Sequence, residues 1–253
     1  MSGRWPLGSE VKQGVIEGGA MLYDASRARN LTAAWFDPRY WSSRGELDGA
    51  ARGRGTTHFV RSRDRRLVLR HYHRGGLIAL LSSDRYIWRG EDLTRPFAEW
   101  SITYRLHRAG LPVPAPIAAR YVRRGNTYHG DIITERLTTV GSLAECLALG
   151  ALSIVTWISI GRCIRRFHDF GVCHADLNAR NVMLSEESVY LVDFDRCELR
   201  RAGLWRDANL VRLRRSLEKI TYGLPAERFS EADWHGLLNG YWQSAAAREP
   251  PAG

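Results

Sequence analysis

Lysine is nearly absent from this chain of 253 residues, although the chain is strongly basic. Only Lys12 and Lys219 stand against 35 arginines, and the formal net charge is +10 at pH 7. Six arginines and one acid lie in residues 61–74, and eight bases and three acids lie in residues 196–219. This charge favours an anionic partner such as nucleic acid, a membrane face or a phosphorylated substrate, or else belongs to a solvated surface.

Paired cysteine motifs and long apolar runs are also missing. The four cysteines form no C-x-x-C pair, so we expect free thiols in a reducing compartment, with neither a disulfide framework nor a zinc site. The longest apolar stretch, residues 149–161, is too short and too rich in Ser and Thr to cross a bilayer. No basic segment followed by an apolar one begins the chain, so we expect a cytoplasmic address.

The order of the predicted elements indicates an α+β fold with two lobes. Residues 51–73 read as a hairpin opened by a Gly-rich bend, and residues 94–110 read as a helix with Pro96 in its first turn. A second hairpin follows at residues 117–137. We therefore expect an N-terminal lobe over residues 1–137, with a β-sheet, a glycine-rich loop and one long helix.

The rest of the chain predicts a mainly helical C-terminal lobe over residues 138–253. Ser142 and Glu145 form a capping-box signature, and residues 152–170 carry apolar side chains at helical spacing. A polar loop and a short strand follow, and the residues after Asp195 again look helical. We expect the ligand in the cleft between the lobes.

The densest polar cluster is H-A-D-L-N-A-R-N at residues 174–181, followed by D-F-D at 193–195. Asn181 and Asp193 can supply the oxygen ligands that Mg²⁺ takes beside phosphate groups. Asp176, five residues before Asn181, can stay outside that metal shell and accept a proton from a hydroxyl group. These parts suit phosphoryl transfer, in which catalysis is mostly positioning and charge stabilisation.

The two segments resemble motifs of the protein-kinase-like superfamily. Residues 174–181 are similar to the catalytic loop H-R-D-L-x-x-x-N, with the same spacing from Asp176 to Asn181, and residues 193–195 are similar to D-F-G. Upstream, residues 53–60 (G-R-G-T-T-H-F-V) resemble the loop G-x-G-x-x-G-x-V, with His58 at the last glycine. Residues 67–70 resemble V-A-I-K, with Arg70 in place of the lysine.

The resemblance implies a bilobal kinase-like fold that uses ATP and Mg²⁺. It implies that Gly53 and Gly55 belong to the loop over the ATP phosphates, and that Arg70 contacts them while Glu99 holds it. A surface Arg and a surface Glu are the alternative reading of that pair. The metal ligands would be Asn181 and Asp193, and the proton acceptor would be Asp176. His174 and Asn178 are expected to brace the loop, and the role of Asp195 stays open.

Further segments resemble the Kdo kinases, which are lipopolysaccharide core sugar kinases of Gram-negative bacteria. They are L-R-H-Y-H-R-G-G-L at 69–77, R-P-F-A-E-W at 95–100 and G-L-P-V-P-A-P at 110–116. This resemblance implies ATP-dependent phosphorylation of a hydroxyl group of Kdo on a Kdo-bearing lipid A precursor. It also implies a peripheral protein at the cytoplasmic face of the inner membrane, whose anionic surface suits a basic chain with exposed tryptophans.

Three alternatives remain open at this point. A heptose kinase of the same pathway would share the motifs and differ in the acceptor sugar. A pseudokinase that binds membrane through its basic face is a second reading, because Arg70 and His58 depart from the kinase pattern. A nucleic-acid-binding protein rests on charge alone, and since the chain has no recognisable nucleic-acid motif, we expect no nucleic acid partner.

Overall fold

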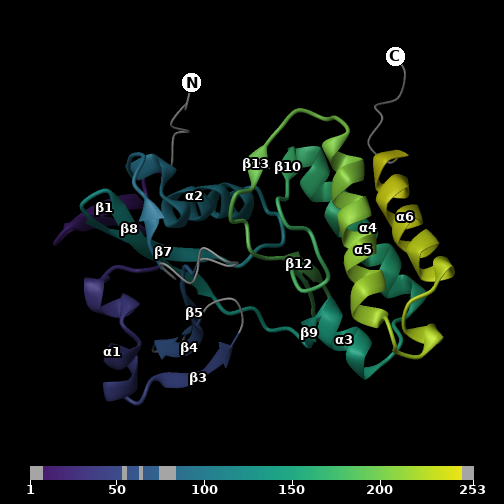
Figure 1. The fold of residues 1–253 in the computed structure, drawn as a ribbon, viewed down its shortest axis with the longest axis horizontal. Coiled ribbons are helices and arrows are strands. Elements are labelled where there is room, and N and C mark those ends of the chain that lie inside the picture. Colours follow the sequence, from purple (N-terminus) through teal and green to yellow (C-terminus); the bar gives the residue numbers. More distant parts are fainter. Residues whose placement is uncertain (1–7, 53–55, 63–64, 74–83, 247–253) are drawn as a thin grey trace. The chain divides into compact units, whose positions relative to one another are not determined.

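The computed structural model describes residues 8–52, 56–62, 65–73 and 84–246 (Figure 1). Its chain forms two compact units. The first comprises Met1–Arg108 and Pro114–Leu137, and the second comprises Ala109–Val113 and Thr138–Gly253. Gly53 and Gly55 of the expected glycine-rich loop lie outside the described residues.

The first unit is built on an antiparallel eight-stranded sheet. Its strands follow the order β1-β2-β7-β8-β5-β4-β3, and β6 pairs with β8 off this path. The strands are β1 (Val11–Ile16), β2 (Gly19–Asp24), β3 (Leu47–Arg52), β4 (Thr56–Ser62), β5 (Arg65–His71), β6 (Tyr86–Ile87), β7 (Pro116–Arg124) and β8 (Thr127–Glu135). The two predicted hairpins are therefore present, as β4–β5 and β7–β8.

One long helix covers one face of this sheet. It is α2 (Arg95–Arg108), preceded by the 3₁₀ helix η3 (Glu91–Leu93), and it packs against β7 and β8. Its aromatic residues Phe97, Trp100 and Tyr104 join one hydrophobic cluster with Ala119 and Ile132 of the sheet. Because side chains alternate along a strand, this face is distinct from the one that carries Leu67 and Leu69.

A short segment that the sequence did not reveal covers the opposite face. It contains the 3₁₀ helix η1 (Ala33–Phe36) and the helix α1 (Pro38–Ser43). The side chain of Asp37 accepts a hydrogen bond from the backbone N–H of Arg39 (2.9 Å), and Pro38 occupies the first helical position. Phe36 and Trp41 are buried in a second cluster with Leu67, Leu69 and Ile133.

The second unit is mainly helical. Its helices are α3 (Leu143–Leu149), α4 (Ile154–Phe170), α5 (Trp205–Thr221), the 3₁₀ helix η4 (Ala226–Arg228) and α6 (Glu231–Ala246). Two small sheets complete it, β12-β11-β9 and β10-β13, made of β9 (Gly141–Ser142), β10 (Val172–Cys173), β11 (Val182–Leu184), β12 (Val189–Leu191) and β13 (Glu198–Leu199). The predicted capping box of Ser142 and Glu145 is present at the start of α3.

Helices α4 and α6 approach each other through glycines. A Cβ atom added at Gly161 would lie 1.9 Å from the carbonyl oxygen of Leu237, and one at Gly240 would lie 2.0 Å from that of Ile158. No side chain fits at either position, so the backbones themselves are in contact. This contact fixes α4, whose C-terminal end leads directly into the polar loop.

The fold thus confirms the predicted α+β class, with strands first and helices after. The four cysteines are free thiols, as expected. Among the described residues, no helix has the length and apolar character needed to span a bilayer.

Candidate active site

In the first unit, Arg70 and Glu99 form the ion pair expected from the sequence. Nη2 of Arg70 lies 2.5 Å from both carboxylate oxygens of Glu99. Only 5% of Glu99 is exposed, so the carboxylate is held away from water by the surrounding α2 and β5 residues. An acid so deeply buried requires a charged partner, which excludes the reading of Glu99 as a plain surface residue.

A tyrosine that the sequence reasoning missed completes this pair. The hydroxyl group of Tyr72 donates a hydrogen bond to Oε2 of Glu99, and the guanidinium group of Arg70 lies 5.0 Å from the centre of the Tyr72 ring. The signal was available, because residues 70 and 72 share a face of an extended strand. Tyr72 therefore orients both members of the ion pair.

The pairing of β4 with β5 shows which residues share the face of Arg70. Phe59 lies opposite Val68 and Thr57 lies opposite Arg70, so these four side chains share one face of the sheet. Val60, the last residue of the segment that resembles the glycine-rich loop, pairs with Leu67 and is buried in the core of the other face. The residue that faces the same way as Val68 and Arg70 is Phe59.

His58, which the motif placed at the last glycine, also points to that other face. It pairs with Leu69, and its Nδ1 atom is buried with no hydrogen-bond partner among the described residues. Burial lowers the pKa of this imidazole, which favours the neutral form. His58 therefore belongs to the packing beneath η1 and α1 and does not share the face of Arg70.

In the second unit, His174 braces the polar loop and carries no charge. Its ring is 2% exposed, its Nε2 lies 3.1 Å from the carbonyl oxygen of Val192, and its Nδ1 accepts from the backbone N–H of Asp176 (3.2 Å). These contacts require the neutral tautomer with the proton on Nε2. Burial lowers the pKa of His174, in agreement with that state.

Asn209 of α5 holds the same histidine through the main chain. Its Oδ1 accepts from the N–H of His174 (3.1 Å), and its Nδ2 donates to the carbonyl oxygen of His174 (3.0 Å). No motif pointed to Asn209, since it lies 35 residues further along the chain. The amide thus ties α5 to the first residue of the loop.

The two asparagines of the loop both bind the carbonyl oxygen of Asp176. Nδ2 of Asn181 donates to it over 2.8 Å, and Nδ2 of Asn178 donates over 3.1 Å, which confirms the expected bracing role of Asn178. The carbonyl oxygen of Asn181 accepts from the N–H of Val192 (3.0 Å), one residue before Asp193. The structure therefore brings Asp176, Asn181 and the start of D-F-D together.

Asp193 begins D-F-D with a left-handed backbone, at φ 64°. Such a conformation is uncommon outside glycine, although Asp tolerates it better than most residues. The next residue, Phe194, is 1% exposed and stacks on Phe167 of α4 at 5.9 Å between ring centres. The buried ring fixes the turn at which the Asp193 carboxylate is presented.

The donor set near this turn fits a hard cation. The Asp176 carbonyl engages Nδ2 of Asn181 and not its Oδ1, which is the atom that could serve as a ligand. Asp193 adds a carboxylate, so the donors are oxygen atoms of the kind that Mg²⁺ prefers. Asp176 is half-buried, and the two asparagines hold its backbone.

Comparison with known proteins identifies the family of this arrangement. Residues 38–241 match the family described as lipopolysaccharide kinase (Kdo/WaaP). A 3-deoxy-D-manno-octulosonic acid kinase of Actinobacillus succinogenes is 39% identical over 228 residues, covering 87% of this chain and 95% of the relative. One from Xylella fastidiosa is 46% identical over 204 residues, covering 80% and 81%.

Solved structures show the same fold at much lower identity. WaaP in complex with acyl carrier protein is similar with a TM-score of 0.53 and 18% identity, covering 81% of this chain and 85% of that one. The Rio2 kinase from Chaetomium thermophilum, solved as an ADP/Mg²⁺-phosphoaspartate complex, gives a TM-score of 0.50 and 13% identity, covering 86% and 78%. These likenesses confirm the predicted kinase-like α+β fold. The chain belongs to the lipopolysaccharide kinase (Kdo/WaaP) family.

Proposed function

We propose that this kinase transfers the γ-phosphate of ATP to a hydroxyl group of Kdo in a Kdo-bearing lipid A precursor. The acceptor is supported by the names of the relatives at 39% and 46% identity. The transfer is supported above all by one observation. Asn181 binds the Asp176 carbonyl through its side chain and Val192 through its main chain, which links the proposed base to the proposed metal ligand.

Asp176 is the proposed proton acceptor. Its carboxylate would orient the Kdo hydroxyl group and take its proton as the oxygen attacks phosphorus. Asn181 and Asp193 would hold Mg²⁺, which when bound neutralises charge on the phosphate oxygens. His174 stays neutral in this scheme and only fixes the backbone, as its hydrogen bond to Val192 indicates.

Arg70 is the proposed phosphate contact in the first unit. Glu99 and Tyr72 hold its guanidinium group, which can bind phosphate oxygens in a two-pronged fashion. Gly53 and Gly55 would cover the phosphates, and backbone groups of residues 135–137 would pair with adenine. Phe59 and Val68, on the same face as Arg70, would contact the base.

The test is transfer of radiolabelled phosphate from ATP to a purified lipid A precursor that carries Kdo. Replacing Asp176 with Ala should lower turnover by roughly 10²–10⁴-fold while ATP affinity stays near that of the wild type. Glu187→Ala, which removes an exposed acid of the same unit, is the matched control and should retain activity. Full activity of Asp176→Ala would refute the assignment. Preference for a heptose-bearing acceptor would replace the Kdo assignment.

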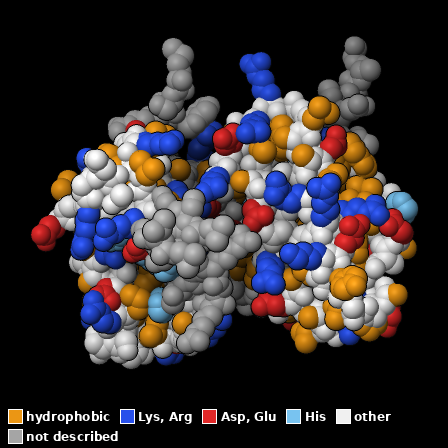
Figure 2. Space-filling view, viewed as in Figure 1, with side chains coloured by type: hydrophobic (Ala, Val, Ile, Leu, Met, Phe, Trp, Pro, Cys, Tyr) orange, Lys and Arg blue, Asp and Glu red, His pale blue; other side chains and the backbone are white. Residues whose placement is uncertain are grey.

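We also propose that the protein docks peripherally on the anionic cytoplasmic face of the inner membrane. Figure 2 shows Lys and Arg side chains gathered along the α5 helix. Arg212, Arg215 and Lys219 lie three and four residues apart and are exposed, so they share one side of the helix. Each base near an anionic surface contributes about 1 kcal/mol.

Exposed apolar residues flank this basic stripe. Leu204 is 86% exposed just before α5, and Tyr222 is 91% exposed just after it. Tryptophan contributes less than the sequence suggested, because Trp41, Trp100 and Trp157 are buried and only Trp242 is a largely exposed tryptophan among the described residues. The proposed membrane contact therefore rests on arginine, Leu204 and Tyr222.

Vesicle co-sedimentation tests this docking surface. Binding to phosphatidylcholine vesicles should rise when anionic phosphatidylglycerol is added, and it should fall with salt. The charge reversal Arg212→Glu with Arg215→Glu should abolish the increase, whereas Arg39→Ala, on the other unit, should leave it unchanged. Equal binding by the charge-reversed variant would reject α5 as the docking element.

A further inference from the structure

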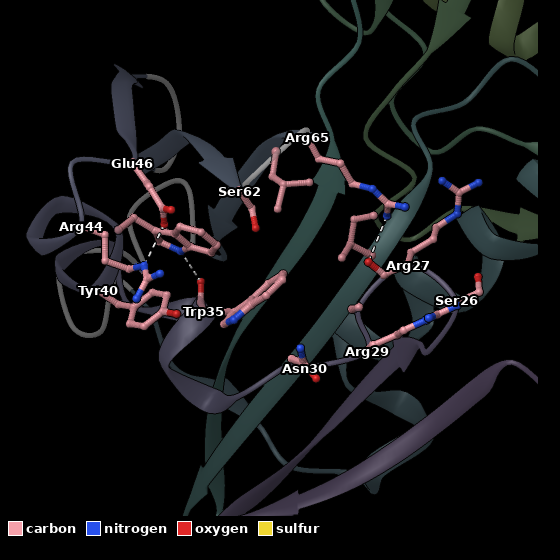
Figure 3. A pocket seen from close by; sticks show the side chains of 14 residues that line it. Ser26, Arg27, Arg29, Asn30, Trp35, Tyr40, Arg44, Glu46, Ser62 and Arg65 are labelled. Carbon is pink, nitrogen blue, oxygen red and sulfur yellow. Dashed lines mark hydrogen bonds and ion pairs between the residues drawn. The ribbon is translucent and has the colours of Figure 1, made fainter.

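A cavity of about 470 Å³ lies in the first unit, on the sheet face opposite α2 (Figure 3). Leu67 of β5 and Ile117 of β7 form its floor, and residues 26–46 supply most of its walls. Arg70 projects from the other face of β5, so the cavity is separate from the proposed phosphate contact. We call it the Arg–Trp cavity, after Arg27, Arg29, Arg44, Arg65, Trp35 and Trp41 of its lining.

The charges of the Arg–Trp cavity are not balanced. Four arginines line it against a single acid, Glu46, and that acid pairs with Arg44 at 3.0 Å. Arg27 is paired outside the cavity lining, with Glu135 at 3.2 Å and Asp24 at 3.6 Å. Among the residues that the structure describes, Arg29 and Arg65 have no carboxylate partner.

Arg65 is nevertheless held in place. Its Nη1 donates to the carbonyl oxygen of Arg27 over 3.0 Å, which occupies one of its five N–H donors. Figure 3 shows Arg27 and Arg65 on one side of the cavity, and Tyr40, Arg44 and Glu46 on the other. A fixed, partly enclosed guanidinium group without a counter-ion favours an anion, with which it can form paired, charge-assisted hydrogen bonds.

The aromatic wall of the cavity is rigid. The indole N–H of Trp41 donates to the carbonyl oxygen of Trp35 (2.7 Å), and the two rings meet edge to face at 5.3 Å between centres. Tyr40 packs against Trp41 at 5.2 Å. Trp41 is buried and Trp35 is half-buried, so Trp35 offers a preformed apolar surface to whatever enters.

Small polar side chains complete the lining. Ser26, Asn30 and Ser62 add hydroxyl and amide groups to the lining, and the hydroxyl group of Ser26 donates to Asp24. Small-molecule sites of this volume combine an apolar surface with a few placed polar groups. An aromatic ring suits the C–H face of a sugar, hydroxyl and amide groups suit its hydroxyl groups, and arginine suits a phosphate or carboxylate on it.

We infer that the Arg–Trp cavity binds an anionic sugar. Arg29 and Arg65 bind its phosphate or carboxylate, and its ring packs against Trp35. The sugar is either a free sugar phosphate or the phosphorylated headgroup of a glycolipid, since both present the same chemistry. This site is a second one, distinct from the site of phosphoryl transfer, and its occupancy requires neither ATP nor Mg²⁺.

Titration calorimetry without nucleotide tests the inference on the full chain. Glucose 6-phosphate should bind, and glucose and inorganic phosphate should bind at least about tenfold more weakly. The double variant Arg29→Ala with Arg65→Ala should weaken glucose 6-phosphate binding by about 100-fold, or about tenfold for each charge-assisted contact. Arg39→Ala, which removes an arginine of the same segment outside this lining, should change nothing.

Two further arms identify the source of the ligand and separate this site from catalysis. In a chain that also carries Arg212→Glu and Arg215→Glu, which removes the proposed docking to anionic vesicles, phosphatidylcholine vesicles with phosphorylated lipid A should still bind if the sugar is lipid-borne. Adding Arg29→Ala and Arg65→Ala to that chain should abolish this binding. Asp176→Ala should keep it, because the two sites are separate. Unchanged binding by the double variant, or no binding of either sugar probe, would overturn the inference.

Discussion

The two units position their proposed functional groups by different means. In the first, the cation of Arg70 is held by charge, through the buried Glu99 carboxylate and the Tyr72 hydroxyl group. In the second, Asp176 is held by neutral groups, namely the His174 ring and two asparagine amides bound to the main chain. The position of Arg70 thus depends on an ion pair, and the position of Asp176 depends on backbone hydrogen bonds.

This difference has a consequence for how each unit fails. Removing the charge of Glu99 would take the counter-ion away from Arg70, whereas removing an amide that holds the loop would leave buried main-chain groups without that hydrogen bond. The same contrast recurs at two histidines, since His71 of the first unit lies beside a carboxylate and His168 of the second is buried beside arginine. Four predictions can break or sharpen the comparison.

The largest effect is expected from Asn209→Leu in the second unit. Leucine has a similar volume and removes both hydrogen bonds to His174, leaving a buried N–H and a buried C=O without partners. Each unpaired group costs roughly 1–3 kcal/mol, so the free energy of unfolding measured in urea should fall by about 4 kcal/mol. Ser216→Ala, which removes one hydrogen bond to the same loop, should cost about 1 kcal/mol. Equal effects would show that the loop is not held by the Asn209 amide.

The next effect is a loss of stability in acid that depends on His168. Burial, followed by the nearby Arg206, lowers the pKa of His168 to about 4, whereas the unfolded chain titrates near 6.5. Below pH 6.5 the unfolded state gains a proton that the folded state does not, so stability falls until pH 4, by about 3 kcal/mol. His168→Gln should lack this component in urea unfolding measured from pH 7 to 4. A parallel pH profile for wild type and variant would contradict it.

Glu99→Gln should have a smaller effect on stability and a specific effect on nucleotide use. Removing the charge weakens the contacts of this side chain to Arg70 and Tyr72. Because hydrogen bonds to a charged group contribute about 2 kcal/mol, the free energy of unfolding should fall by about that amount. The KM for ATP should rise about tenfold, because the guanidinium group loses its fixed position. Tyr72→Phe, which leaves the ion pair intact, should cost about 1 kcal/mol and change KM less. An unchanged KM in Glu99→Gln would remove Arg70 from the nucleotide site.

The smallest effect is expected at His71, with the opposite sign to that of His168. The side chain of Asp131 accepts a hydrogen bond from Nδ1 of His71 (2.6 Å) and raises the pKa of the imidazole. The charge of Asp84 also raises this pKa, and the charge of Arg120 lowers it. The stabilisation is fully present below pH 6.5 and is lost as pH rises through the raised pKa. His71→Gln should therefore lower stability at pH 6 and match the wild type at high pH. A difference that grows with pH would contradict the pairing.

Much of the fold could be predicted because local signals agreed with the tertiary structure. The Ser142–Glu145 capping box, the apolar stripe of residues 154–170 and the two hairpins each leave a short-range pattern. The segment with η1 and α1 has no short-range pattern that was recognised, because its aromatic residues are compatible with a core, an exposed surface or a membrane contact. Its place was decided by Phe36 and Trp41 packing on a distant sheet.

The candidate site was predictable where a motif is contiguous and was missed where partners come from afar. Asp176 and Asn181 lie in one loop, so their spacing alone suggested that they act together. The role of Asn209 could not be predicted from the sequence, because it depends on how α5 packs beside His174. The position of Phe59 was also missed, because it depends on the β4–β5 pairing, which places Phe59 opposite Val68 on the face of Arg70.

The guanidinium group of Arg70 carries a last consequence, for chemical detection. Nucleotide-derived reagents that label kinases by acylation require an amine that can lose its proton, and arginine does not lose its proton in proteins. The only amines on side chains in this sequence are those of Lys12 in β1 and Lys219 in α5, and neither shares the strand of Arg70. If Arg70 contacts the nucleotide as proposed, a survey of bacterial kinases that acylates a lysine at the nucleotide site would not detect this enzyme, however abundant it is in the cell.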